Sequence, residues 1–327
     1  MADKRFLDAI HDALHEEMSR DPSVVVLGED VGKKGGVFGV TEGLYQAFGE
    51  ARVIDTPLAE SCIVGVAVGM SVNGLRPVAE IQFADFIHPA FDQILSEAAR
   101  LRYRSKNDFG CPIVIRTPYG GGVHGALYHS QSIEAFYAHV PGLKVVVPYT
   151  PADAKGLLKA AVRDPDPVLF LEHKRMYRSV RGEVPDSDFT VPIGPAAIRR
   201  PGRDLSSFAY GLMVHESLQA ADALGKEGIE AEVVDVRTLR PLDTKTILAS
   251  VERTNRALIV YEDNRFGGFG GEIAATIAEE GFRNLDAPPT RLAGPDVPAV
   301  PFSHPFEEWF MISAPKIAAA ARALVAY

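Results

Sequence analysis

Continuous apolar runs bounded by turn-forming residues recur through the first half of the chain, with amphipathic segments between several of them. The runs are VVVLGED (24–30), RPVAEIQF (76–83), CPIVIRTP (111–118), LKVVVPY (143–149) and PVLFLEH (167–173). Strands that are buried on both faces of a parallel sheet have this uninterrupted apolar pattern. The pattern therefore predicts an α/β domain built on a parallel sheet.

The pattern breaks between Gly182 and Asp204, where four prolines and several charges fall, and we expect the domain joint there. We take residues 1–190 as the first domain and 191–327 as the second. The second half then alternates predicted strands and helices: LSSFAYG, HESLQAADALGKEG, AEVVDV, DTKTILASVERT, ALIVYED, GEIAATIAEEG, TRLAG and PKIAAAARALVAY. This alternation predicts a second, smaller doubly wound α/β domain.

The N-terminal segment is predicted to form an amphipathic helix that docks by its apolar face. Its apolar residues recur at helical spacing between charged residues: Phe6, Ile10, Ala13, Leu14 and Met18. It is not a secretory signal. The most apolar run, CIVGVAVGMSV (62–72), is about half as long as a membrane span requires. We therefore expect no membrane association.

Charge and cysteine content narrow the class of protein further. The 327-residue chain has a net charge of −9 with acids in both halves, which argues against a nucleic-acid surface. The basic run RLRYRSK (100–106) is an exception, and we interpret it as a solvated helix end. Only Cys62 and Cys111 occur, so no disulfide framework is indicated and a reducing, cytoplasmic location is expected.

Polar groups follow most of the predicted strands. Ligands of open parallel sheets bind beyond the carboxyl ends of the strands, so these residues form the first set of candidates. They are Glu29 and Asp30, Thr56 to Ser61, Gln82 to Phe86, Tyr119 to Gln131, and Tyr149.

Two glycine-rich segments, GKKGG (32–36) and FGGFGGE (266–272), suggest phosphate binding at first sight. Neither has the spacing of a P-loop or of a dinucleotide-binding fingerprint. A turn and a tight strand-to-helix corner are the alternative interpretations.

The segment YGGGVHGALYHSQS (119–132) carries His124 and His129 without any acid, lysine or cysteine. Five residues apart, the two histidines point to different faces of a helix or strand, which disfavours a shared metal. The chain also lacks HExxH, CxxC and GxSxG motifs. His129 is therefore a structural histidine unless a bound cofactor gives it a chemical partner.

The segment DTPLAES (55–61) places Glu60 directly before the small-residue run GVAVG. An acid at a helix start commonly just stabilises the helix dipole. The glycines permit close helix packing, however, and a carboxylate in such an apolar setting has a raised proton affinity unless a ligand donates to it.

Taken together, nine segments resemble the beta subunits of thiamine-diphosphate-dependent 2-oxo acid dehydrogenases, in order and over nearly the whole chain. They are LGEDVG, VFGVTEGL, DTPLAES, RPVAEIQFADF, RYRS, HGALYHSQS, PGLKVVVP, DAKGLLKAA and RTLRPLD. The resemblance implies a pyrimidine-binding domain followed by a transketolase-type C-terminal domain. EIQFADF and HGALYHSQS look closer to the branched-chain subunits than to the pyruvate subunits.

The resemblance also implies roles for individual residues. Glu60 matches the glutamate that binds a ring nitrogen of the cofactor's aminopyrimidine and thereby promotes deprotonation of the thiazolium carbon. Leu58, Gln82 and Phe86 match positions on the pyrimidine side of the pocket, and Phe86 stands where many relatives carry tyrosine. His129 matches the histidine that assists proton movement during acyl transfer to a lipoyl group.

The motif Gly-Asp-Gly, which holds the diphosphate and its divalent metal in this family, does not occur, and Gly28-Glu29-Asp30 is the nearest sequence. The resemblance therefore implies an alpha subunit that holds Mg²⁺, an alpha2-beta2 heterotetramer, and a chain that is inactive alone. It also implies a lipoyl acyltransferase core as partner and a 2-oxo acid as substrate.

Relatives carry a structural potassium ion, and the matching positions are Ile113, Ala161, Val162, Asp164 and Asp166. A surface turn in RDPDP is the alternative. Two other functions stay open: a pyruvate dehydrogenase beta subunit, and a non-catalytic scaffold retained for assembly.

Overall fold

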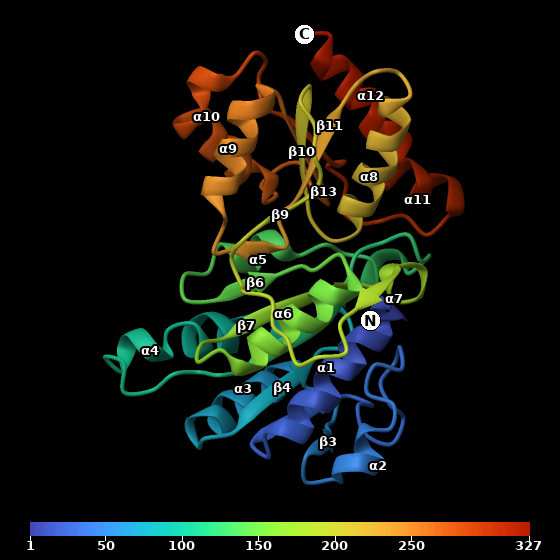
Figure 1. Ribbon diagram of the computed structural model, residues 1–327. Coiled ribbons are helices and arrows are strands. Elements are labelled where there is room, and N and C mark those ends of the chain that lie inside the picture. Colours follow the sequence, from blue (N-terminus) through green and yellow to red (C-terminus); the bar gives the residue numbers. More distant parts are fainter. The chain divides into compact units, whose positions relative to one another are not determined.

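The computed structural model describes all residues, 1–327, and the chain forms two compact units (Figure 1). The first unit contains Met1–Tyr119 and Phe136–Ile193, and the second contains Gly120–Ala135 and Gly194–Tyr327. The chain thus passes from the first unit to the second after Ile193, and the earlier segment Gly120–Ala135 also belongs to the second unit.

The first unit is built on a parallel sheet, in which its strands follow the order β6-β7-β5-β4-β2-β3. Each of the five apolar runs contains one strand, and the parallel α/β fold predicted from them is confirmed. The strands are β2 (Val24–Gly28), β3 (Val53–Asp55), β4 (Arg76–Glu80), β5 (Val114–Tyr119), β6 (Lys144–Val146) and β7 (Val168–His173). A separate antiparallel pair joins β1 (Ala2–Arg5) to β8 (Arg181–Val184).

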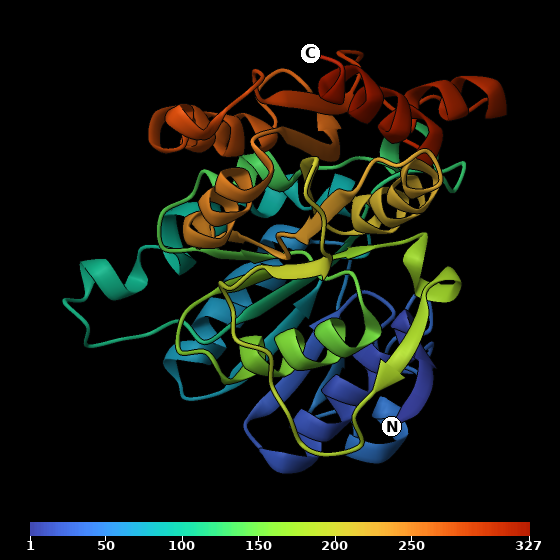
Figure 2. The ribbon, with the colours of Figure 1, turned by 45° about the horizontal axis from the view of Figure 1, so that its top comes forward.

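Helices connect these strands. The N-terminal helix α1 (Phe6–Arg20) lies beside α6 (Pro151–Arg163), as Figure 2 shows. All five apolar residues that predicted this helix are buried. The remaining helices of the region are α2 (Leu44–Phe48), α3 (Glu60–Val72), η1 (Ala84–Phe86), η2 (His88–Ala90), η3 (Gln93–Ala98), α4 (Leu101–Arg104), η4 (Ala126–Tyr128), α5 (Glu134–Ala138) and α7 (Met176–Ser179).

The second unit contains a five-stranded sheet in the order β14-β13-β10-β11-β9. The predicted strands β10 (Leu205–Ala209), β11 (Ala231–Asp235), β13 (Ala257–Asn264) and β14 (Thr290–Gly294) are parallel. The edge strand β9 (Ala197–Arg200) runs antiparallel to β11 and was not predicted. A short strand, β12 (Thr238–Arg240), follows β11.

Helices cover both faces of this second sheet. Figure 1 shows α9 (Thr244–Thr254) and α10 (Gly270–Glu280) on one side of β10 and β13, and α8 (Leu212–Gly225) and α12 (Ala314–Val325) on the other. The short helices η5 (Phe282–Asn284) and α11 (His304–Phe310) complete the unit. No helix in either unit has the length and apolar character needed to cross a membrane.

Candidate active site

Polar side chains gather at the carboxyl ends of β2 and β4 in the first unit. The amide nitrogen of Gln82, just after β4, donates to the Glu29 carbonyl oxygen (3.4 Å) and to Oδ2 of Asp30 (3.2 Å). Lys34 in turn donates to Asp30 over 2.8 Å. The expected gathering of strand-end residues is therefore present for these groups.

The carboxyl group of Glu29 is buried at this edge of the sheet. Glu29 is 5% exposed, and its Oε1 atom has no hydrogen-bond partner. Burial, followed by the negative charges of Glu60 and Asp30, raises the pKa of Glu29 to about 7. The first turn of α3, which begins at Glu60, thus brings a second carboxylate close to a carboxyl that holds its proton near neutral pH.

Several apolar side chains just before α3 and along this helix are exposed. Leu58 is 81% exposed, and Val66 and Val72 on α3 are also exposed. The Phe86 ring, at the end of η1, stands edge-on to Phe83 with 5.9 Å between ring centroids. An apolar surface of this kind around a polar site is typical of a surface that another molecule covers.

A buried ion network, which the sequence analysis missed, joins three neighbouring strands of the first unit, β4, β5 and β7. The Arg116 guanidinium donates to Glu80 (2.7 Å) and twice to Glu172 (2.6 and 2.7 Å), and the Tyr177 hydroxyl also donates to Glu172 (2.7 Å). Burial raises the pKa of Glu80, against the attraction of Arg116. One charged residue inside each of three apolar runs was the available signal.

His129 lies in the loop of the second unit, where it follows η4 and is half-buried. Gly125 packs directly against it: a Cβ on Gly125 would come within 2.6 Å of the His129 carbonyl oxygen and 2.8 Å of its Cβ. The Gly120 N–H donates to the Gln131 carbonyl oxygen (2.9 Å) and closes the loop. The loop around His129 is therefore a compact structure that requires glycine.

The other histidine, His124, pairs with Glu307 of α11, with 2.6 Å between Nδ1 and Oε2. No group of three His, Cys, Asp or Glu side chains able to hold a metal occurs in the chain. His124 thus has a carboxylate partner rather than a metal.

Further buried acids surround the ends of the His129 loop. Glu262 accepts from the Gly121 N–H (2.6 Å) and from the Ser132 hydroxyl (3.3 Å), while the Tyr210 hydroxyl donates to Glu134 (2.8 Å). Burial raises the pKa of Glu134 well above its usual value. These contacts explain why Gly120–Ala135 groups with the second unit.

Glu60, Leu58, Gln82 and Phe86 thus belong to the first unit, and His129 belongs to the second. The predicted site therefore has one part in each unit, and each part is described within its own unit. That Glu60 and His129 face one ligand stays a prediction.

The residues predicted to bind potassium already have donors within the chain. The Ile113 carbonyl accepts from the Val168 N–H (3.0 Å), and the Arg76 guanidinium donates to the carbonyls of Val162 (2.9 Å) and Asp164 (3.2 Å). A carbonyl oxygen has two lone pairs, so a cation can still bind. The positive charge of Arg76 disfavours one.

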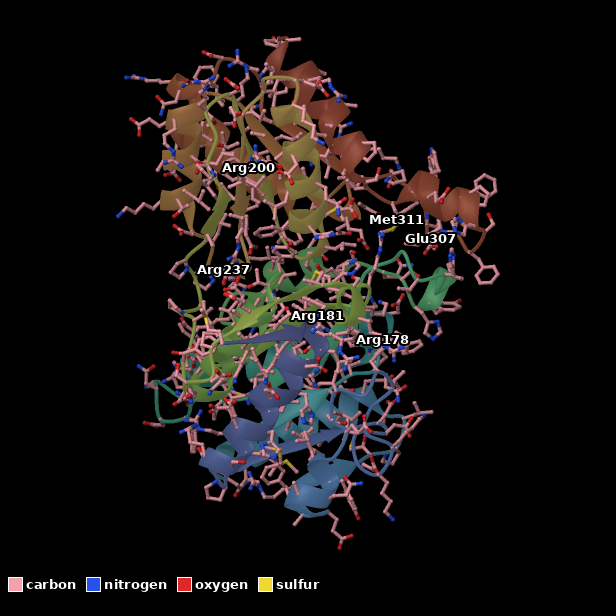
Figure 3. All side chains as sticks on the ribbon, turned by 45° about the vertical axis from the view of Figure 1, so that its right-hand side comes forward. Arg178, Arg181, Arg200, Arg237, Glu307 and Met311 are labelled. Carbon is pink, nitrogen blue, oxygen red and sulfur yellow. The ribbon has the colours of Figure 1, made fainter.

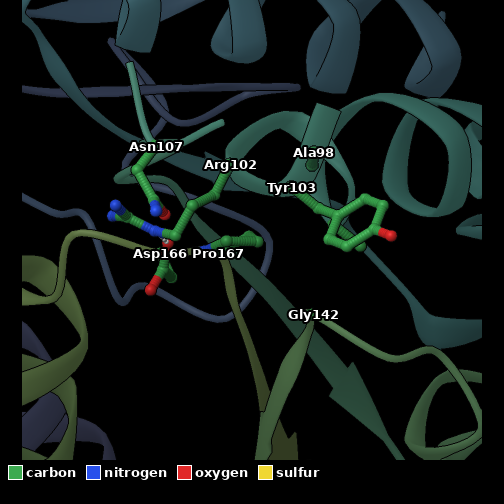
Figure 4. Close-up of a pocket in the computed structure, with 8 residues that line it drawn as sticks. Ala98, Arg102, Tyr103, Asn107, Gly142, Asp166 and Pro167 are labelled. Carbon is green, nitrogen blue, oxygen red and sulfur yellow. Dashed lines mark hydrogen bonds and ion pairs between the residues drawn. The ribbon is translucent and has the colours of Figure 1, made fainter. Parts of the chain in front are cut away.

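The two aspartates of this region are also engaged. Lys144 donates to both carboxylate oxygens of Asp164 at 2.6 Å, and Arg102 donates to Asp166 at 2.5 Å. Figure 4 shows the latter ion pair in a pocket of about 230 Å³, also lined by Tyr103 and Asn107. None of the predicted cofactor-binding residues lines this pocket, and its volume is below the roughly 300–1,000 Å³ of ligand sites.

The two glycine-rich segments have the structures of the alternative interpretations, a turn and a tight strand-to-helix corner. The N–H groups of Gly32 and Lys33 donate to the Asp55 carboxylate (2.6 and 3.3 Å), so a side chain of the protein already occupies this turn. At Gly270, the first residue of α10, a Cβ would lie 2.0 Å from the Tyr261 ring. The second segment is therefore a tight corner.

Comparison with known proteins agrees with this architecture. The family model for the transketolase pyrimidine-binding domain matches residues 4–180, and that for the transketolase C-terminal domain matches residues 194–317. A solved structure entitled "Split gene transketolase, inactive beta4 tetramer" matches with a TM-score of 0.79 and 27% identity over 98% of each chain. Fold and strand-end site thus define a chain of the transketolase type.

Two curated relatives narrow the class. The 2-oxoisovalerate dehydrogenase subunit beta of Bacillus subtilis (strain 168) is 58% identical over 98% of each chain. The pyruvate dehydrogenase E1 component subunit beta of the same organism is 52% identical over 94% of this chain and 95% of its own. This chain belongs to the family of 2-oxo acid dehydrogenase beta subunits.

Proposed function

We propose that the chain is the beta subunit of a branched-chain 2-oxo acid dehydrogenase. The assembled enzyme decarboxylates a 2-oxo acid oxidatively and transfers the acyl group to a lipoyl group of an acyltransferase core. The observation that carries the proposal is the 58% identity, over almost the whole of both chains, to a 2-oxoisovalerate dehydrogenase subunit.

Thiamine diphosphate fits the strand-end site of the first unit. The site offers two buried oxygens without partners, Oε1 of Glu29 and Oγ1 of Thr56, together with the exposed apolar surface at Leu58. When bound, the cofactor would supply a carbon nucleophile and an electron-withdrawing ring that takes up the negative charge left by decarboxylation. Glu60 would hold a proton at a pyrimidine nitrogen, while Gln82 and Phe86 would orient the ring.

Substitution of Glu60 by glutamine tests this role. The amide has the size of the carboxyl group but cannot exchange a proton, so the reconstituted enzyme should lose activity by about 100-fold or more. Full activity of the Glu60→Gln enzyme would instead support the non-catalytic scaffold. The conservative control is Asp55→Asn: Asp55 is the last residue of β3, and its carboxylate accepts from the N–H groups of the Gly32–Lys33 turn.

An alpha subunit completes the site in this proposal. The chain has no cluster of metal ligands, so Mg²⁺ and the diphosphate would be held by the alpha subunit. The exposed side chains of Leu58, two residues before Glu60, and of Val66 on α3 support a second chain at this edge of the sheet. We propose an alpha2-beta2 heterotetramer, which size measurement of the purified assembly would test.

His129 would assist proton movement during acyl transfer to the lipoyl group. Its replacement by alanine should leave cofactor binding unchanged and reduce lipoamide acylation by about 100-fold, within the range of general acid–base catalysis. Unchanged acylation would reject this role. His139, a histidine outside the loop, is the matched control for substitution by alanine.

Substrate choice separates the branched-chain enzyme from the pyruvate alternative. We expect the reconstituted enzyme to have a higher kcat/KM for 3-methyl-2-oxobutanoate than for pyruvate. A higher kcat/KM for pyruvate would instead favour a pyruvate dehydrogenase, to one beta subunit of which the chain is 52% identical.

A structural potassium ion at the carbonyls of Ile113, Ala161 and Val162 with Asp164 and Asp166 is part of the same proposal. If it binds, replacing KCl by choline chloride should lower the midpoint of thermal unfolding. An equal midpoint in the two salts would contradict a bound potassium ion and leave the side chains of Arg76, Arg102 and Lys144 as the cations of this region. A cytoplasmic location likewise stays a proposal from the two free cysteines.

A further inference from the structure

A buried carboxylate of the C-terminal region holds the loop that carries His129. Glu307, on α11, is 3% exposed. Its Oε1 accepts from the N–H groups of Gly122 (2.9 Å) and His124 (3.1 Å), and its Oε2 pairs with Nδ1 of His124 (2.6 Å). Figure 3 shows Glu307 on α11 beside the loop.

The backbone of the loop is shaped for this carboxylate. Gly122 has φ 78° and His124 has φ 54°, both in the left-handed region. Backbone turns of this kind direct successive N–H groups toward one point and form a nest that binds an anion. Here the anion is the side chain of Glu307.

A second contact between the C-terminal region and the loop is apolar. Met311, directly after α11, belongs to a small buried cluster with Val300 and Phe310. A Cβ on Gly121 would lie 2.9 Å from the Met311 sulfur atom and 3.4 Å from a Val300 methyl group. The loop thus packs closely on this cluster at the residue before the nest.

We propose that Glu307 is a positioning residue for His129. The connection is short: His124 is followed by Gly125, which packs on His129, and then by the single turn of η4, directly after which His129 lies. A carboxylate that fixes His124 therefore fixes both the start of this turn and the glycine that supports its end. This inference depends on the proposed role of His129 in acyl transfer.

Glu308 offers a matched control on the same helix. Its side chain is 70% exposed, and it pairs with His304 over 3.2 Å at the surface. Alanine at either position removes one carboxylate from α11, but only Glu307→Ala empties the nest.

The first measurement uses the reconstituted enzyme with its alpha subunit. Misplacement of a reacting group by about 1 Å lowers a rate by as much as about 100-fold, so Glu307→Ala should reduce lipoamide acylation by about 10- to 100-fold. Decarboxylation measured with an artificial electron acceptor should stay close to wild type, as should both activities of Glu308→Ala. Sodium formate, a carboxylate small enough for the vacated nest, should restore acylation in Glu307→Ala, whereas sodium chloride at equal ionic strength should not.

The second measurement is independent of activity. Amide hydrogen exchange of the full-length chain should become faster over residues 121–129 in Glu307→Ala and stay unchanged in Glu308→Ala. Glu307→Gln, which keeps an acceptor oxygen for the two N–H groups, should show an intermediate rate.

Unchanged exchange in Glu307→Ala, or a loss of acylation that formate does not relieve, would overturn the inference. Failure of the proposed function has a different signature, because His129→Ala would then leave acylation intact. In that case the exchange experiment still decides whether Glu307 holds the loop.

Discussion

The protonated carboxyl of Glu29 gives a pH-dependent term in stability that one substitution removes. An ordinary glutamate has a pKa of 4.5, and that of Glu29 is raised to about 7 by burial and by the charges of Glu60 and Asp30. Because the native state binds this proton more tightly than the unfolded state, the contribution of Glu29 is most favourable below pH 4.5. It is lost as the pH rises through 7.

The size of this loss follows from the raised pKa. Each unit of the difference between a pKa of 4.5 and one of about 7 corresponds to about 1.4 kcal/mol. Ionisation of Glu29 therefore lowers the free energy of unfolding by about 3 kcal/mol at pH 8. Glutamine at this position resembles the protonated acid and has no such term. The Glu29→Gln chain should therefore gain about 3 kcal/mol over wild type between pH 4 and pH 8.

Urea unfolding of both chains at several pH values measures this difference. Other titrating groups, such as Asp263, whose pKa is raised to about 6 mainly by burial, affect both chains equally and cancel. A difference between the two chains that stays constant within about 0.5 kcal/mol from pH 4 to pH 8 would refute the reasoning, since it would mean that Glu29 ionises as freely in the native state as in the unfolded chain.

Two further predictions concern the first unit. Arg116→Met leaves two buried carboxylates without their cation, so it should lower the free energy of unfolding by about 3–5 kcal/mol. The control, Arg178→Met, changes an exposed arginine (Figure 3) and should alter that free energy by about 0.5 kcal/mol or less. Equal effects of the two substitutions in urea unfolding would contradict a stabilising role of the ion network. Gly142→Ala forces a Cβ to 2.1 Å from the Ala99 carbonyl oxygen at φ 94°, while Gly74→Ala has a similar φ of 90° in open space. Thermal unfolding should show Gly142→Ala to be the less stable of the two, and an equal midpoint would argue against the close contact.

The parallel strands were predictable because they are buried on both faces and so read as apolar runs. The antiparallel edge strand β9 escaped notice because its sequence, AIRR, follows neither pattern, and its strand character comes from pairing with β11. The short strand β3 likewise depends on its pairing with β2. Edge and short strands are thus defined by their neighbours more than by their own residues.

The site was less predictable than the sheet. Glu60 and Gln82 stood out because strand ends are informative and because the motifs resemble a known family. The partner of Arg116 and the anchors of the His129 loop could not be found in this way, since Gly122 and Glu307 are 185 residues apart. Only the fold brings such groups together, although a lone charge inside an apolar run does indicate that a buried partner exists.

Reconstitution is the most direct test of a shared active site. The chain alone, its alpha subunit alone and the two together would be assayed for oxidation of 3-methyl-2-oxobutanoate with thiamine diphosphate, Mg²⁺ and lipoamide. Activity should appear only in the mixture and should be lost when the mixture contains Glu60→Gln. Turnover by the chain alone, or full activity of the Glu60→Gln mixture, would contradict a cofactor site divided between the two subunits.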